Sequence, residues 1–280
     1  MSILHAIVLG IVQGLTEFLP ISSSGHLVIV PWLFGWKDFD TAATARAFDT
    51  ALHLGTLVAV LIYLRKDLIV YILEGSQLIF KRKQPATQAG RRAWLLVFSA
   101  VPAGIVGAAF EDKITEKLGS PALISVSLIV FGVILIWADR QATSNNYQQS
   151  VDALTMRDAL VIGAAQVLAL NPGTSRSGIT ITAARLAGYS REAAARLSFL
   201  MSVPIISGAV VFKLAKLVRD GIPDGLLMPM IVGIVVAGIS GWIAMWSMIR
   251  LVQTKTFAPY VVYRCLIGAG VLLAVATGFR

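Results

Sequence analysis

Residues 13–26 read QGLTEFLPISSSGH and place a polar break inside an apolar stretch. Residues 1–36 contain one formal charge, that of Glu17, and the helical pattern is interrupted at Pro20 and by the serines and glycine that follow it. The stretch therefore reads as an apolar helix, a polar break and a second apolar helix, and not as one simple helix. Non-helical backbone is tolerated at membrane depth only where protein or water satisfies its polar groups. We therefore expect a re-entrant helical hairpin that encloses a polar pocket.

The same organisation recurs between Ala159 and Ala184, where residues 171–178 read NPGTSRSG and Arg176 is the one formal charge. The two stretches align without gaps at an offset of 153 residues. Identical residues in this alignment include Gln13 with Gln166, Ser22 with Ser175, Ser24 with Ser177, Gly25 with Gly178, and Asp67 with Asp220. Paired interrupted segments in two halves of a chain are typical of inverted-topology repeats.

The composition is that of a membrane protein. Of 280 residues, 56% are hydrophobic and 14% are charged, whereas about a quarter of the residues in a soluble domain are charged. Six stretches are long and apolar enough to cross a bilayer, namely residues 45–64, 93–110, 120–138, 197–218, 225–249 and 257–279. We expect one all-α polytopic domain over residues 1–280, with six transmembrane helices and two re-entrant hairpins. The two repeat halves are expected at about residues 1–140 and 154–280. Because three spans separate the two breaks, the second half should be inverted, so that the hairpins enter from opposite membrane faces and meet near the midplane.

The net charge of +9 is concentrated in loops, and seven basic residues lie between Leu64 and Trp94. Cytoplasmic loops of membrane proteins are enriched in Lys and Arg. We therefore predict that this loop is cytoplasmic and that both termini lie outside, and we expect no nucleic-acid partner. The single cysteine, Cys265, lies inside the last span and cannot form an intrachain disulfide.

The first break carries residue types suited to phosphoryl chemistry. Glu17 lies four residues after Gln13, on one helical face, and a carboxylate in an apolar segment is costly and usually functional. Ser23 is a candidate nucleophile, and His26 would complete a cluster of nucleophile, base and acid. The alternative is a shallow hairpin with Glu17 at the water interface and His26 bonded to a carbonyl group. Asp49 and His53, also four residues apart, are candidates for lining the same pocket, although Asp49 could simply start a helix.

The second break is suited to binding an anion. Gly173 and Gly178 allow close backbone approach, successive amides can form an anion-binding nest, and a helix after Gly178 would point its positive end at the same place. Hydroxyl donors come from Thr174, Ser175 and Ser177. Arg176 supplies a planar fork that matches phosphate oxygens. The alternative is that Arg176 pairs with Glu17 and fixes the two hairpins together.

These two motifs resemble those of the bacterial undecaprenyl-diphosphate phosphatases, the bacitracin-resistance protein family. The residues that carry the resemblance are Gln13, Glu17, Pro20, Ser22, Ser23, Ser24, Gly25 and His26 in the first motif, and Pro172 through Gly178 in the second. The resemblance covers nearly the whole chain. Family members have Glu in some cases at the position of Gln13, an aromatic residue at that of Asn171, and Glu at that of Asp49. The first departure halves the charge available there for a metal.

The resemblance implies hydrolysis of undecaprenyl diphosphate to undecaprenyl phosphate and phosphate. This reaction recycles the lipid carrier for peptidoglycan synthesis at the bacterial cytoplasmic (inner) membrane, and it confers bacitracin resistance. It also implies a divalent cation, Mg²⁺ or Ca²⁺, with Glu17 and Gln13 as the candidate ligands. Ser22, Ser24 and Gly25 would join the second motif in binding phosphate. The preferred prenyl chain, the metal and the assembly, a homodimer among the options, stay open.

In the mechanism that we expect, Arg176, the backbone of Ser175–Gly178 and a cation hold the diphosphate. Glu17 binds the cation or acts as general base, Ser23 or a water molecule attacks, and His26 transfers a proton. The main rival is a lipid-phosphate flippase or anion transporter, since inverted repeats also suit alternating access. A membrane lipid phosphatase that uses two histidines is excluded, because no histidine follows His53.

Overall fold

The computed structural model describes residues 1–39, 41–80, 87–222 and 224–279. Within this part of the chain every regular element is helical, and the one β-type contact is an isolated bridge between Gln149 and Tyr189. The expected all-α class is therefore confirmed.

Six helices are long and apolar enough to span a membrane. They are α3 (Ala42–Tyr63), α5 (Gln88–Leu118), α6 (Pro121–Ser144), α9 (Arg191–Asp220), α10 (Leu227–Thr254) and α11 (Ala258–Ala276). Each contains or overlaps one of the six predicted spans, so the chain is a multi-pass membrane protein. Several helices run past the predicted limits because the charged residues at their ends are helical too. In α5, for example, the helix begins five residues before the uncharged segment that starts at Ala93.

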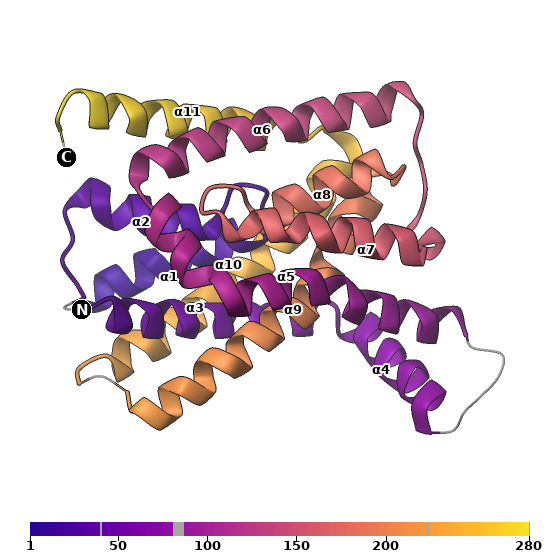
Figure 1. Ribbon diagram of the computed structural model, residues 1–280, viewed down its shortest axis with the longest axis horizontal. Helices are drawn as coiled ribbons and strands as arrows, with labels where there is room; N and C mark the ends of the chain where they lie inside the picture. Colours follow the sequence, from indigo (N-terminus) through magenta and orange to yellow (C-terminus); the bar gives the residue numbers. More distant parts are fainter. Residues whose placement is uncertain (40, 81–86, 223, 280) are drawn as a thin grey trace.

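Two pairs of shorter helices flank the polar breaks. The first pair is α1 (Ile3–Phe18) and α2 (Ser23–Phe34). The second is α7 (Met156–Ala165), extended by the 3₁₀ turn η2 (Gln166–Leu170), and α8 (Arg176–Leu186). Figure 1 shows the two pairs coming from opposite ends of the molecule, with their breaks near its middle. Both helix interruptions predicted from the sequence are present, whereas the depth at which the hairpins enter a bilayer stays a prediction.

The ends of the molecule agree with the expected sidedness. Both termini lie at one end in Figure 1, and α4 (Arg65–Phe80) projects at the other. A short 3₁₀ turn, η1 (Val151–Ala153), precedes α7. Part of the predicted basic loop, residues 81–86, lies outside the described residues. Which end faces the cytoplasm remains the prediction made from the basic residues.

Close helix contacts recur in the two halves. Helix α1 packs on α10 and α7 packs on α5. In both contacts a glycine allows the backbones to approach. A Cβ atom added at Gly14 would lie 2.5 Å from the carbonyl oxygen of Ala237, and one added at Gly163 would lie 2.3 Å from that of Ser99. The two glycines are not equivalent at the offset of 153 residues, since Gly163 aligns with Gly10. The repeat halves themselves stay a prediction.

The contact at Gly163 predicts a position-specific loss of stability. Gly163→Ala must push α7 away from α5, and overpacking of this kind costs about 1–3 kcal/mol. Gly104→Ala, in the same helix as Ser99, meets no atom within 4 Å and should be neutral or stabilising by up to ~1 kcal/mol through helix propensity. Thermal unfolding of both variants in detergent measures the difference. Equal midpoints would show that the α5–α7 contact is looser than described.

Labelling of introduced cysteines tests the sidedness. In a Cys265→Ala background, Gln148→Cys and Lys117→Cys both expose the new thiol at the surface. The basic-loop argument places residue 148 inside and residue 117 outside. A membrane-impermeant maleimide should therefore label residue 117 in intact cells and residue 148 only after lysis. The reverse pattern would invert the whole orientation.

Candidate active site

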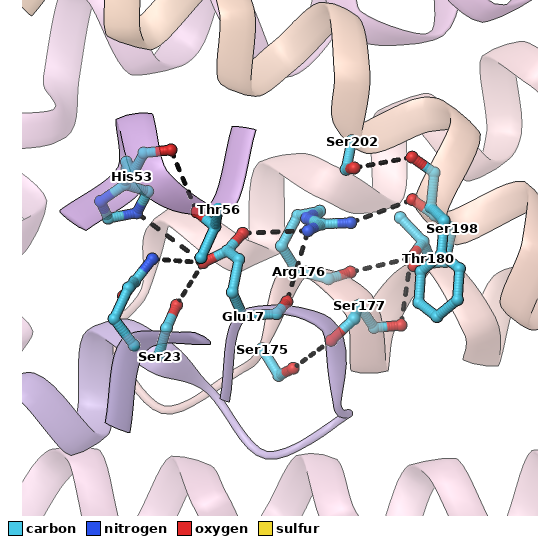
Figure 2. A network of polar contacts seen from close by, with 12 residues as sticks. Glu17, Ser23, His53, Thr56, Ser175, Arg176, Ser177, Thr180, Ser198 and Ser202 are labelled. Carbon is cyan, nitrogen blue, oxygen red and sulfur yellow. Dashed lines mark hydrogen bonds and ion pairs between the residues drawn. The ribbon is translucent and has the colours of Figure 1, made fainter. Parts of the chain in front are cut away.

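A buried ion pair joins the two breaks. Glu17 lies in the last turn of α1, and Arg176 is the first residue of α8. The Nη2 atom of Arg176 lies 2.9 Å from Oε1 of Glu17 and also donates to the Glu17 carbonyl oxygen at 3.3 Å. The two side chains are 14% and 6% exposed, so the charges are largely removed from solvent. Figure 2 shows the pair at the centre of a polar network. The pairing that the sequence left as an alternative is thus present.

The second oxygen of the Glu17 carboxylate faces the predicted nucleophile. The hydroxyl of Ser23 donates to Oε2 at 2.6 Å, and Nε2 of Gln13 donates to the same atom at 3.2 Å. A serine hydroxyl that donates to a carboxylate is placed for general-base activation. The pair Glu17–Ser23 therefore has the geometry of a base and its nucleophile.

The local backbone places Ser23 and Arg176 in equivalent positions. Each is the first residue of the helix after its break, and each follows a serine with a φ of 76°, Ser22 and Ser175 respectively. These serines cap their helices, because their hydroxyls accept from the backbone N–H three residues later. A positive φ is unfavourable for a residue with a Cβ atom and is often found at functional sites. The turn directs the next side chain of each motif toward Glu17.

Most of the predicted phosphate-binding residues are buried, and three of them bond one break to the other. Of the set Ser22, Ser24, Gly25, Gly173, Thr174, Ser175, Ser177 and Gly178, all except Ser24 are buried. The N–H of Gly173 donates to the hydroxyl of Ser22 at 3.1 Å, and the hydroxyl of Ser177 donates to the carbonyl oxygen of Leu19 at 2.8 Å. Their direct binding of phosphate stays a prediction. Ser24 is the one member whose side chain is open to the surroundings.

His26 makes its hydrogen bonds to the first break itself and to α11, and not to Glu17. Its Nδ1 is 2.8 Å from the carbonyl oxygen of Ser22, and its Nε2 is 3.0 Å from the hydroxyl of Tyr263. A carbonyl oxygen can only accept, so Nδ1 carries a proton, and Nε2 of the neutral ring accepts from Tyr263. The bond to a carbonyl group that the sequence left as an alternative is therefore present. The proton-transfer role predicted for His26 stays a prediction and would require the Tyr263 bond to open.

The imidazole beside Glu17 is that of His53. Its Nδ1 lies 2.7 Å from the carbonyl oxygen of Asp49, which assigns the proton to Nδ1, and its Nε2 lies 3.7 Å from Oε2 of Glu17. Nε2 is therefore the unprotonated nitrogen of His53, and it is the one that faces Glu17. The His53 side chain is one-third exposed. The Asp49 carboxylate lies within electrostatic reach of His53 and Lys213. His53 thus lies beside Glu17, whereas a place for Asp49 in the pocket stays a prediction.

Three partners in this region were not anticipated from the sequence. The carbonyl oxygen of Ser198 accepts from Nη1 of Arg176 at 3.0 Å and so fixes the guanidinium from α9. Tyr263 holds the ring of His26, and its neighbour Arg264 is completely buried behind both breaks. The signal that could have identified Arg264 is a single arginine within the apolar stretch 257–279.

The residues near Glu17 fit a hard divalent cation. Oε1 of Gln13 is buried and has no hydrogen-bond partner among the described residues, and it belongs to the side chain that contacts the Glu17 carboxylate. No group of three His, Cys, Asp or Glu side chains in the described ranges could hold a metal alone. Mg²⁺ is commonly held by one or two carboxylates together with substrate phosphate oxygens. One carboxylate and one free amide oxygen suit such a shared site.

Known proteins resemble the chain over its full length. A family model described as "Bacitracin resistance protein BacA" matches residues 6–270. A protein of Geobacter metallireducens named "Undecaprenyl-diphosphatase" is 46% identical over 98% of both chains. Relatives of the same name from Pelobacter propionicus and Moorella thermoacetica are 45% and 41% identical over 99% and 96% of each chain. A match of this extent, together with the two motifs around one ion pair, means that this chain belongs to the bacitracin resistance protein family.

Proposed function

We propose that this protein hydrolyses undecaprenyl diphosphate to undecaprenyl phosphate and inorganic phosphate. The observation that carries the proposal is the convergence of Ser23, Glu17 and Arg176 in one buried network. A nucleophile, a base and a guanidinium that matches phosphate oxygens are the groups that phosphoryl transfer needs. Full-length relatives that bear the name of this activity support the substrate.

Each of the three residues has a distinct task in this proposal. Arg176 releases the Glu17 carboxylate and donates hydrogen bonds to the terminal phosphate instead. The freed carboxylate then takes the proton of the Ser23 hydroxyl. The serine oxygen bonds to the terminal phosphorus as the bridging P–O bond breaks, and undecaprenyl phosphate leaves with the bridging oxygen. Water then hydrolyses the phosphoserine to phosphate. In the alternative without a phosphoserine, Glu17 activates a water molecule that attacks the same phosphorus directly. Neutralisation of charge on the transferred group is the largest contribution to catalysis in either case.

The same site would hold Mg²⁺ or Ca²⁺ through the Glu17 carboxylate and the amide oxygen of Gln13. When bound, the cation supplies further positive charge for the phosphate oxygens. His53, with Nε2 facing Glu17, is placed to share the proton that Glu17 receives. To act as proton donor to the leaving oxygen, His26 first gains a proton at Nε2, because Nδ1 holds the proton of the neutral ring, and its bond to Tyr263 opens.

The proposed location is the bacterial cytoplasmic membrane, where the product re-enters peptidoglycan synthesis and removal of the diphosphate limits the target of bacitracin. A homodimer is the assembly to be tested. The second candidate function is a lipid-phosphate flippase. It is favoured by a cavity of about 390 Å³ lined by Tyr63, Arg196 and Phe199. The ring of Phe199 also contacts that of Phe18, which follows Glu17 in the chain.

Replacement of Arg176 tests the phosphate contact. Arg176→Lys keeps the charge but loses the planar fork, so phosphate release should fall by roughly two orders of magnitude or more. Phosphate release by the purified variant in detergent is the measurement. Arg140→Lys, at an exposed position of α6, is the matched control and should retain full turnover. Near-normal turnover of Arg176→Lys would mean that the residue only balances the charge of Glu17.

Replacement of Glu17 separates an enzyme from a transporter. Glu17→Gln keeps the size of the side chain but removes the base, so phosphate release should drop by roughly a hundredfold or more. Binding of the lipid diphosphate should survive or tighten, because one negative charge near the phosphates is lost. Turnover and lipid binding are measured on the same purified variant, with Glu116→Gln, an exposed change, as the control.

The outcome that contradicts the enzymatic role of Glu17 is specific. If Glu17→Gln releases phosphate at the normal rate while translocation of the lipid in liposomes fails, Glu17 is a transport residue. The flippase would then be the better account of the site.

A further inference from the structure

The most deeply buried cation of the described chain is not part of the proposed chemistry. Arg264 lies in the middle of α11 and is 0% exposed. Within the described residues, no carboxylate lies within ion-pair distance of it. An unpaired buried charge is very unfavourable unless other polar groups solvate it. Its environment should therefore reveal what offsets this cost.

Five backbone carbonyl groups surround the guanidinium. Nε donates to Leu128 at 2.8 Å, and Nη2 donates to Ser127 at 3.4 Å, both in α6. Nη1 donates to Pro20 of the first break at 3.0 Å. Nη2 also donates to Gly173 at 2.9 Å and to Thr174 at 3.1 Å, in the second break. One side chain thus connects α11 and α6 to both breaks.

The carbonyl groups from the two breaks are equivalent. Pro20 and Gly173 are separated by 153 residues, the offset of the sequence repeat. Pro20 follows the end of α1, and Gly173 follows the end of η2, so the cation lies near two helix C-termini, where the helix dipole favours positive charge. Gly178 leaves room for the guanidinium, since an added Cβ atom there would lie 3.0 Å from Nη1.

We propose that Arg264 is a positioning residue for the phosphatase site, which sets the spacing of the two breaks and thereby the distance between Ser23, Glu17 and Arg176. Pro20 lies three residues from both Glu17 and Ser23, and Thr174 lies two residues from Arg176. Arg264 itself faces the rear of the breaks and touches none of the reacting groups. The inference rests on the proposed site, since it explains how that site keeps its shape.

A lysine cannot reproduce this arrangement. The guanidinium is a rigid plane with five donors that reach carbonyl groups on different elements at once, whereas an ammonium group is a compact point charge. Arg264→Lys therefore keeps the charge within the core but cannot bind the two breaks and α6 together. The breaks are then held to each other by the bonds from Gly173 to Ser22 and from Ser177 to Leu19, together with the Arg176–Glu17 pair.

The experiment is steady-state kinetics of purified Arg264→Lys, Ser22→Ala and the double variant, with folding checked by size-exclusion chromatography and thermal unfolding. Because a misplacement of ~1 Å can cost about a hundredfold in rate, kcat of Arg264→Lys should fall by roughly 10–100-fold while KM changes less than about threefold. Since both residues act on the spacing of the breaks, the effects of Arg264→Lys and Ser22→Ala on kcat should be clearly non-additive. Arg250→Lys, an exposed change in α10, is the control.

Several outcomes would overturn the proposal. A normal kcat for folded Arg264→Lys excludes a positioning role, and so does a change confined to KM, which would indicate contact with substrate. A loss of kcat that matches the loss of folded protein would make Arg264 a stability residue only. Arg176→Lys is assayed in parallel to distinguish failure of this inference from failure of the proposed function. If Arg176→Lys is impaired and Arg264→Lys is not, the proposed active site is supported and the positioning role of Arg264 is contradicted.

Discussion

The structure depends on one constraint, which is that a carboxylate and a guanidinium held in an apolar bundle must satisfy each other. The helix pairs that carry Glu17 and Arg176 come from opposite ends of the molecule. The two side chains form an ion pair with a distance of 2.9 Å between Nη2 of Arg176 and Oε1 of Glu17. Their meeting requires each helix to stop near the middle, and this leaves two stretches of non-helical backbone. These stretches satisfy each other, through Ser22 with Gly173 and through Arg264 with both. Substrate phosphate can then enter the site by replacing the carboxylate at Arg176.

The two motifs have diverged at the positions that carry the chemistry. Ser23 and Arg176 occupy equivalent places after the same turn, and both side chains reach the same carboxylate. The residue equivalent to Glu17 in the second motif is Leu170. In the proposed mechanism, one half therefore supplies base and nucleophile, and the other supplies the phosphate-binding cation. A single site formed from two unlike halves is what a hydrolase needs.

The sequence predicted the parts of this arrangement that follow from the scarcity of charge. Six spans, two helix interruptions and the proximity of Glu17 to Arg176 all follow from lone charges and Gly/Ser runs in apolar stretches. The contact of His26 with Tyr263 and the contacts of the second-break hydroxyls could not be predicted, because they depend on which helices face one another. Tyr263 reaches His26 from a helix 237 residues away along the chain. The role of Arg264 does not follow from the sequence, because an arginine in a span usually suggests a charged partner, whereas its partners are carbonyl groups that no sequence pattern marks.

The central claim is that the terminal phosphate of the lipid binds between the two breaks, at Arg176 and Ser23. A structure with a non-hydrolysable isoprenoid diphosphate analogue tests this claim most directly. We predict that the terminal phosphate accepts hydrogen bonds from the Arg176 guanidinium, that the Ser23 hydroxyl faces its phosphorus, and that the Arg176–Glu17 bond is broken or shared. A head group bound instead in the cavity beside Arg196 and Phe199, with the Arg176–Glu17 pair intact, would contradict the account.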